Sequence, residues 1–196
     1  MSLAGLEPPS PTWAPAGPER PSAVLALLSA GDRPDLVVTV RSPGLAHHGG
    51  QISFPGGGRE PGDASPAAAA LRETAEEIGL DPARVCVLGQ LPLRPLAVSS
   101  NRVVPVVGEW DGAGDLYPAD PAEVDRVVRW PVALLADPAY RVTARHPRGG
   151  TGVAFVWGDL FLWGFTAGLT DQLLRLGGWE RPWEESRVMD VPARYR

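Results

Sequence analysis

Three glutamates and one arginine lie together in a short stretch of the sequence. The string "RETAEE" begins at Arg72 and contains Glu73, Glu76 and Glu77. On a helix these carboxylates lie within about one turn of one another, where each like-charged pair costs about 0.2–0.5 kcal/mol. A divalent cation would turn this repulsion into attraction. Because the ligands are oxygens only, we expect Mg²⁺ or Mn²⁺ and not structural zinc, which takes thiolates and imidazoles.

The residues that precede this acidic cluster are glycines. Gly56, Gly57 and Gly58 in "FPGGG" have no side chains, so their amides and carbonyls can approach a bound group closely. The string "RETAEE" alone is common on solvent-exposed helices, where it indicates solubility and no chemistry. The adjacent glycines are what favour a site, in which phosphate oxygens and a cation meet between the loop and the glutamates.

A helix must carry the glutamates, and the sequence marks both of its ends. Ser65 is a natural N-cap, Pro66 suits the first helical position and Gly79 follows the last turn, so the predicted helix spans 65–78. At about 100° per residue the glutamates lie opposite the face that is expected to pack. That face consists of Leu71, Ala75 and Ile78.

The remaining elements predict a mixed sheet with helices on its faces. Runs rich in β-branched residues, separated by Pro, Gly and Asp clusters, predict strands over 35–42, 51–54, 84–91, 103–110, 123–130, 140–144 and 152–157. Two more helices are expected over 22–30 and over 161–176, the second ending at Gly177. Cys86 lies in one predicted strand and is expected in the core.

Length and composition favour one globular domain with a decorated tail. We expect a Pro-rich tail over 1–21, one domain over 22–178 and a C-terminal tail over 179–196. No run approaches the roughly 18 apolar residues of a membrane span, and the start lacks the pattern of a secretory signal, so a cytoplasmic protein without a membrane partner is expected. A net charge of −5 argues against nucleic acid as a partner.

The segment from Gly58 to Leu80 resembles the signature of the Nudix hydrolase family. That signature reads Gly, five residues, Glu, seven residues, then Arg-Glu-aliphatic-any-Glu-Glu-any-Gly-aliphatic. The matching positions are Gly58, Arg72, Glu73, Glu76, Glu77, Gly79 and Leu80. Thr74 stands where an aliphatic residue is usual, and Ala64 stands in place of the first Glu, which in the family braces the loop against the helix arginine. Here the neighbouring Asp63 takes over that brace, or the brace is absent.

This resemblance implies a Nudix fold, an α/β/α sandwich with a mixed β-sheet, and a pyrophosphatase that needs Mg²⁺ or Mn²⁺. The implied metal ligands are Glu73 and Glu77, followed by Glu76, and Arg72 completes the catalytic set. The general base varies among branches of the family, and Glu76 and Glu123 are both candidates. Small Nudix enzymes often pair, so a homodimer is a further expectation, with the aromatic C-terminal tail as one surface.

A second similarity lies upstream, in "VVTVRSPGLAHHGGQISFPGG". This stretch looks like the extra motif of the Nudix subgroup that cleaves coenzyme A, and similarity to the subgroup continues over residues 22–176. It implies that Arg41 and Ser42, together with the three glycines, bind substrate; a strand end beside the loop is a good place to meet phosphate. Ala46 falls where a polar or basic residue is expected. His47 and His48 are interpreted as loop or substrate contacts, since they lack partners at metal-ligand spacing.

The substrate implied by the subgroup is coenzyme A, a small nucleotide, cleaved to 3′,5′-ADP and 4′-phosphopantetheine. ADP-ribose, NADH and dinucleoside polyphosphates need the same metal helix with a different wall around it, so they stay open as alternatives. A Nudix-like module that binds a nucleotide and regulates without cutting is the alternative of another class. Retention of all three helix glutamates argues against it.

Overall fold

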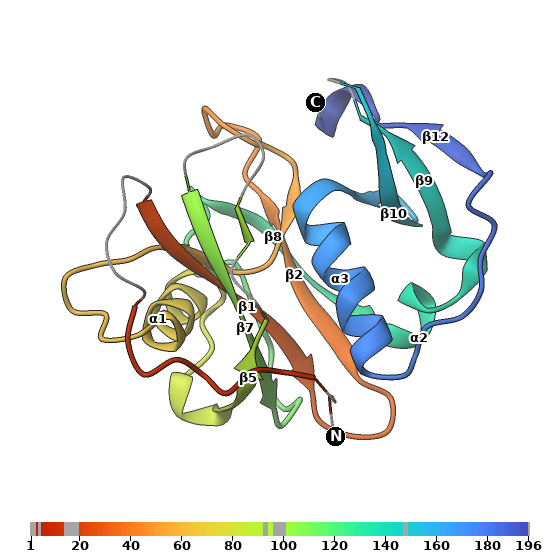
Figure 1. Cartoon of the computed structure of the whole chain (residues 1–196). Coiled ribbons are helices and arrows are strands. Elements are labelled where there is room, and N and C mark those ends of the chain that lie inside the picture. Colours follow the sequence, from red (N-terminus) through yellow and green to blue (C-terminus); the bar gives the residue numbers. More distant parts are fainter. Residues whose placement is uncertain are drawn as a thin grey trace.

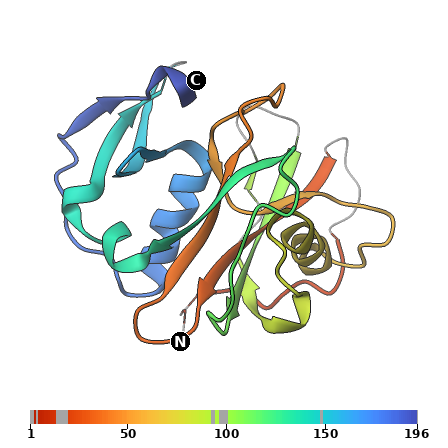
Figure 2. The same cartoon turned by 180° about the vertical axis from the view of Figure 1, so that it is seen from behind.

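The computed structural model describes residues 3, 5–13, 20–91, 94–95, 101–146 and 149–195, and these form two β-sheets and three α-helices (Figure 1). The first sheet has eight strands along the order β3-β2-β1-β7-β5, with β4, β6 and β8 paired beside this path, and the second has the order β11-β10-β9-β12. Helix α1 covers one face of the first sheet, and α3 lies between the other face and the second sheet (Figures 1 and 2). The expected α/β/α sandwich with a mixed sheet is confirmed.

The centre of the first sheet is a long parallel pair. Strand β1 (Arg20–Ser29) runs parallel to β7 (Asn101–Trp110), from Arg20 opposite Asn101 to Ser29 opposite Trp110. The helix predicted over 22–30 is therefore wrong. Alternate residues of this segment pack on opposite faces of the sheet, Leu25 in the cluster under α1 and Leu28 in the cluster under α3. A strand buried on both faces is apolar at every position, and so short an apolar run can be mistaken for a helix.

The other strands of the first sheet complete the frame around α1. Their bounds are β2 (Asp35–Arg41), β3 (Ile52–Ser53), β4 (Gly56–Gly58), β5 (Val85–Gln90), β6 (Arg94–Pro95) and β8 (Val124–Pro131). Strand β2 pairs antiparallel with both β1 and β8. Cys86 lies in β5 but is exposed, so its predicted core position is wrong. Strand β5 ends the main path of the sheet, and a strand in that position can turn side chains to solvent.

The second sheet packs its strands beside α3. It contains β9 (Arg141–Arg145), β10 (Thr151–Trp157), β11 (Leu160–Leu162) and β12 (Val188–Asp190). Helix α3 (Gly164–Leu176) begins later than predicted, because the first residues of the predicted 161–176 helix belong to β11 and Trp163 has an extended backbone. Short helical segments complete the chain: α2 (Val132–Leu135), η1 (Pro82–Arg84), η2 (Pro138–Tyr140) and η3 (Ala193–Tyr195).

Parts of both expected tails pack against the domain. In the N-terminal tail Leu3 is buried in the cluster around α3, and Glu7 forms a β-bridge with Gln90. Residues 1, 2, 4 and 14–19 of that tail lie outside the described residues. In the C-terminal tail β12 pairs parallel with β9, and Tyr195 is buried in the core of the second sheet. Within the ranges described, no helix is long and apolar enough to cross a membrane.

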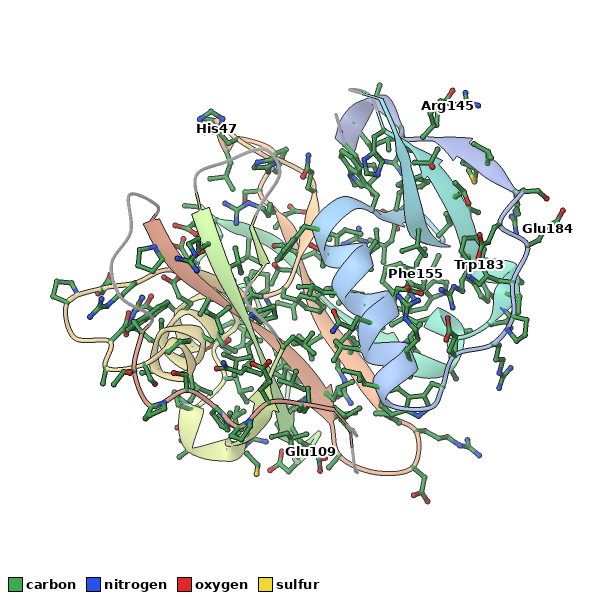
Figure 3. The ribbon with its side chains drawn as sticks, viewed as in Figure 1. His47, Glu109, Arg145, Phe155, Trp183 and Glu184 are labelled. Carbon is green, nitrogen blue, oxygen red and sulfur yellow. The ribbon has the colours of Figure 1, made fainter. Side chains whose placement is uncertain are left out.

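A buried arginine joins α3 to the second sheet and the C-terminal segment. Arg141 is 1% exposed, and its guanidinium lies 5.3 Å from the ring centre of Phe155 and 4.9 Å from that of Trp183 (Figure 3). Its Nη2 donates to Asp171, whose second carboxylate oxygen accepts from Arg175. Nε and Nη1 of Arg141 have no partner among the described residues. Asp171 is therefore the carboxylate that balances this buried charge.

Replacing that carboxylate should destabilise the fold strongly. We expect Asp171→Ala to lower the free energy of unfolding by about 3–5 kcal/mol, because it leaves a buried guanidinium without a counterion. Urea unfolding followed by circular dichroism measures this. The matched control is Arg175→Ala, which removes the 55%-exposed partner of the same carboxylate and should cost less than about 1 kcal/mol. Equal effects of the two substitutions would contradict this role of Asp171.

Candidate active site

Helix α1 (Pro66–Ile78) begins and ends where the sequence predicts. The hydroxyl of Ser65 accepts a hydrogen bond from the Ala68 amide at 3.2 Å, which satisfies one free donor at the helix start. At the other end Gly79 takes a left-handed backbone, φ 71°, and its amide donates to the Ala75 carbonyl. These caps fix the position of every glutamate on the helix.

The glycine strand β4 lies between the central strand and the acidic helix. It pairs antiparallel with β1, with Gly56 opposite Val24. A Cβ on Gly56 would be 2.3 Å from the Ala23 carbonyl oxygen, and Gly56 has φ 150°. A Cβ on Gly57 would be 2.4 Å from Oε1 of Glu73. Glycine is required at Gly56, where a Cβ would collide with backbone atoms of β1. At Gly57 a Cβ would displace the Glu73 carboxylate, so a side chain there would disturb that carboxylate and not the strand.

Glu77 is the most buried of the three helix glutamates. It is 4% exposed, and its Oε2 accepts a hydrogen bond from the Gly56 amide at 3.3 Å. Burial raises the pKa of Glu77 to about 8; the Gly56 bond and the positive charge of Arg41 oppose this shift, and the charges of Glu73 and Glu123 add to it. The sequence placed this residue on the solvent side of the helix, and that expectation is wrong.

The packing face of α1 is rotated from the predicted one. Its buried residues are Pro66, Ala69, Ala70, Thr74, Glu77 and Ile78. Of the predicted face only Ile78 is fully buried, whereas Leu71 and Ala75 are half-buried. Because Ala69 and Ala70 are small, they allow α1 to lie close to the sheet. The side of the helix that packs therefore includes Glu77. Thr74, at the position of a family aliphatic residue, is buried with its hydroxyl donating to the Ala70 carbonyl at 2.6 Å.

Glu73 and Glu76 both bind Arg72. Oε1 of Glu73 is 3.0 Å from Nη2, and Oε2 of Glu76 is 2.8 Å from Nη1. The Glu73 side chain is 17% exposed, and burial raises its pKa although Arg72 opposes the shift. The Glu76 side chain is 57% exposed. The side chains of Glu73 and Glu77 therefore pack against the glycine strand β4, while Glu76 pairs with Arg72 on the solvent side.

Asp63 supplies the brace that the sequence left open. Its Oδ1 accepts from Nε of Arg72 at 3.3 Å and its Oδ2 accepts from Nη2 at 3.1 Å. The Glu60 amide also donates to Oδ2, at 2.7 Å, and Nη2 of Arg72 donates to the Gly58 carbonyl at 3.1 Å. Burial acts to raise the pKa of Asp63, but the bonds from Arg72 and Glu60 prevail and lower it. Asp63 thus stands in for the missing signature Glu at position 64.

Arg41 and Ser42 lie at the end of β2 and have different surroundings. Arg41 is half-buried, and its positive charge acts to lower the pKa of Glu77. Ser42 is buried; its hydroxyl donates to the Pro121 carbonyl at 2.8 Å and its amide donates to the Glu123 carbonyl at 2.8 Å. Its contact with phosphate stays a prediction. The structure gives it a second task, which is to hold the turn that carries Glu123.

Glu123 is the acidic residue that this turn brings towards the helix. It is exposed, and its negative charge raises the pKa of both Glu73 and Glu77. Pro121, whose carbonyl holds Ser42, was missed by the sequence reasoning, because a contact across 79 positions leaves no local pattern. The arrangement places an exposed carboxylate from a different segment within electrostatic range of the two helix carboxylates.

The His-containing loop lies at one edge of this region, with His47 at its outer tip (Figure 3). His47 and His48 are both exposed, and Nδ1 of His48 is 3.0 Å from Oε1 of Gln51. Gln51 in turn donates to the Tyr195 carbonyl at 3.0 Å, which fastens the loop to the C-terminal segment. Ala46 is exposed in the same loop. These contacts agree with a loop role for the histidines.

The donor set suits Mg²⁺ or Mn²⁺ in type. Glu73 and Glu77 offer oxygens only, and two neighbouring, poorly solvated carboxylates gain most from a bound cation. Among the residues described, no group of three or more His, Cys, Asp and Glu already lies in a metal-binding arrangement. Glu76 would have to leave Arg72 to become a third protein ligand, so water and substrate oxygens would complete the shell around the other two.

Removing the Asp63 carboxylate should loosen this region. We expect Asp63→Ala to lower the free energy of unfolding by about 2–3 kcal/mol, since the partly buried Arg72 loses two charge-assisted hydrogen bonds. Thermal and urea unfolding measure the change. Glu60→Ala is the control: its carboxylate is 64% exposed and 3.8 Å from Arg72, so less than about 1 kcal/mol is expected. A loss for Asp63→Ala no larger than the control would reject the brace.

Burial of Glu77 should make stability depend on pH in a definite direction. Its folded pKa of about 8 lies above the ordinary glutamate value of 4.5, so the folded protein holds the proton more tightly and loses stability as the pH rises from about 4.5 to 8. In chelator-treated protein, Glu77→Gln should therefore unfold like the wild type near pH 4 and be more stable by about 5 kcal/mol above pH 8. A wild-type-to-variant difference that stays constant across this range would contradict the burial.

Comparison with known proteins assigns the chain to a family. Residues 19–147 match the NUDIX domain family. A protein named "Uncharacterized Nudix hydrolase NudL" from Klebsiella pneumoniae subsp. pneumoniae is 39% identical over 165 residues, covering 81% of this chain and 84% of that protein. The protein of the same name from Escherichia coli (strain K12) is 38% identical over 168 residues, covering 81% and 83%.

Solved structures show the same fold. A Nudix hydrolase from M. smegmatis, RenU, superposes with a TM-score of 0.58 at 16% identity, over 85% of this chain and 91% of that one. A NUDIX hydrolase from Nitrosomonas europaea gives a TM-score of 0.51 at 14% identity, over 89% and 82%. The family match covers the glycine strand, the acidic helix and the Glu123 turn, and the chain belongs to the Nudix hydrolase family.

Proposed function

We propose that this protein hydrolyses the pyrophosphate linkage of a small nucleotide substrate with the help of Mg²⁺ or Mn²⁺, and that this substrate is coenzyme A or one of its derivatives. The observation that carries the proposal is the packing of the Glu73 and Glu77 carboxylates against the Gly56 and Gly57 backbone, beside Arg41. Acidic oxygens, a close backbone and a cationic side chain are the groups that a metal-bound diphosphate requires.

The metal would be held by Glu73 and Glu77. When bound, it would lower the pKa of a water molecule and neutralise charge on the diphosphate. Arg72 orients Glu73 by a direct ion pair and is itself fixed by Asp63. Arg41 would bind phosphate oxygens at the end of β2, where its charge also offsets that of Glu77.

The reaction itself is an in-line displacement at phosphorus. Water attacks one phosphorus, the bond to the bridging oxygen breaks, and the second phosphate leaves with that oxygen. A general base takes a proton from the water. We assign this task to Glu123 in preference to Glu76, because Glu76 is already paired with Arg72. Glu123 is exposed, and it is near enough to the helix for its charge to raise the pKa of Glu73.

The choice of coenzyme A rests on the sequence upstream of the helix. Thr39, Arg41 and Ser42 match the extra motif of the coenzyme A subgroup, and the glycine run follows in its place. The charge of Arg41 acts on Glu77, and Ser42 anchors the turn of Glu123, which supports a role for this motif next to the proposed metal ligands. Cleavage of the coenzyme would give 3′,5′-ADP and 4′-phosphopantetheine.

A substrate panel tests the proposal. The protein is incubated with Mg²⁺ or Mn²⁺ and, separately, with coenzyme A, ADP-ribose, NADH and diadenosine tetraphosphate, and the products are separated by chromatography. We expect coenzyme A to be cleaved, and Glu73→Gln to reduce kcat a few hundredfold, which corresponds to about 3–4 kcal/mol of lost transition-state stabilisation. Glu109→Gln, at the far end of β7 from the His47 loop, should keep wild-type activity (Figure 3).

The other outcomes are equally informative. Cleavage of ADP-ribose, NADH or the dinucleoside polyphosphate without cleavage of coenzyme A would keep the hydrolase and reject the substrate. Nucleotide binding without turnover of any compound would contradict hydrolysis and support the regulatory module. Full activity of Glu73→Gln would contradict the assigned site.

A further inference from the structure

An aromatic residue outside the family match contacts the candidate site. Trp13 precedes the matched residues 19–147 and lies in the stretch that the sequence assigns to a tail. Its indole Nε1 donates a hydrogen bond to the Asp63 carbonyl at 3.0 Å, across 50 positions of sequence. The indole also packs against the hydrophobic cluster under α1. The N-terminal segment thus reaches the loop that precedes the acidic helix.

The loop is held from both sides at Asp63. The carbonyl of Asp63 accepts from Trp13, while its carboxylate accepts twice from Arg72 on the helix. Within the loop the Asp63 amide donates to the Glu60 carbonyl at 3.0 Å. One residue therefore connects the N-terminal segment to the arginine that orients Glu73.

A second contact between the same segments stacks a cation on the indole. The guanidinium of Arg59 lies 5.5 Å from the Trp13 ring centre, within cation–π distance. The amide of Arg59 donates to the Pro21 carbonyl at 3.0 Å, next to the pairing of β1 with β4. Both ends of the 59–63 loop are thereby attached to residues of the first 21, and the inner side of the loop is attached to Arg72.

We propose that Trp13 is a positioning residue for the acidic site. It fixes the Asp63 backbone, so that the Asp63 carboxylate holds Arg72 and Arg72 holds Glu73 against Gly57. The effect on metal binding rests on the function proposed above, whereas the effect on Arg72 does not. The N-terminal segment is then part of the site's frame, although it supplies no group to the reaction.

Loss of this support should act on the metal more than on the substrate. A loop that samples several conformations gives Arg72 several orientations, and Glu73 then loses the single geometry that suits a cation. Arg41 and the strands that carry it are untouched, so substrate affinity should change little. Faster exchange at Arg72 together with weaker metal binding, in protein that is still folded, is a combination that a general loss of folded protein would not give.

The test replaces Trp13 by phenylalanine, which keeps an aromatic ring for Arg59 and removes the donor to Asp63. Two properties are measured on the full chain: the solvent exchange rate of the Arg72 Nε–H group by NMR, and Mn²⁺ affinity by calorimetry. We expect each to change on the order of fivefold, the worth of one hydrogen bond, with faster exchange and weaker Mn²⁺ binding. Trp13→Ala, which also removes the ring, should show a larger change in both.

The matched control is Trp183→Phe. Trp183 likewise carries an arginine over its ring, but it lies in the C-terminal segment beside Phe155 and the second sheet (Figure 3). It should leave the Arg72 exchange rate and Mn²⁺ affinity at wild-type values. The unfolding midpoint of each variant is also measured, to verify that all of them are folded under the conditions of the exchange and binding experiments.

Three results would decide against the idea or separate it from the function. Unchanged Arg72 exchange in both Trp13 variants would overturn the positioning role. Equal changes in the Trp183 control would also overturn it, as they would indicate general loosening. If the wild type binds no Mn²⁺, the proposed function fails, and faster Arg72 exchange in Trp13→Phe still supports the role of Trp13.

Discussion

The candidate site depends on one guanidinium held between carboxylates. Arg72 binds Asp63 on the loop side and Glu73 on the helix side, and its pKa is raised, chiefly by the bond to Asp63. Because arginine is charged at every physiological pH, this connection is permanent. The planar fork of donors matters as much as the charge, since Nε and Nη2 reach both oxygens of one carboxylate while Nη2 also meets the Gly58 carbonyl. A lysine could supply the charge and not this geometry.

The same site contains a group that the fold alone would avoid. Glu77 is buried near the carboxylate of Glu73. One hydrogen bond from the Gly56 amide and the positive charge of Arg41 partly offset the cost of burying its charge. Burial of an acid with so little support is unfavourable, and proteins retain such groups where chemistry needs them. By contrast, the buried Arg141 has a direct carboxylate partner and two aromatic rings, and it connects the elements of the second sheet.

Local signals in the sequence were enough for the acidic helix, because Ser65, Pro66 and Gly79 act on their immediate neighbours. They were not enough for the segment over 22–30, where burial on both faces removes the alternation that identifies a strand. Glu77 is buried because the alanines of α1 let the helix lie close to the sheet. A helical wheel carries no information about the distance between a helix and a sheet, so it could not predict this burial. The Asp63 brace was foreseen as one of two options, since it is local, whereas the contacts of Ser42 and Trp13 join distant positions and leave no pattern.

The glycines of β4 have an evolutionary consequence. At Gly56 any side chain would collide with the Ala23 carbonyl, and at Gly57 a side chain would push the Glu73 carboxylate from its place, so substitutions there cost either the fold or the site. The backbone next to Glu73 and Glu77 is therefore constrained, and lineages that acquire new substrates must do so through segments that tolerate side chains. The exposed loop that contains Ala46 and His47 is such a segment, and drift in this part of the chain can retune selectivity while the reaction chemistry stays constant.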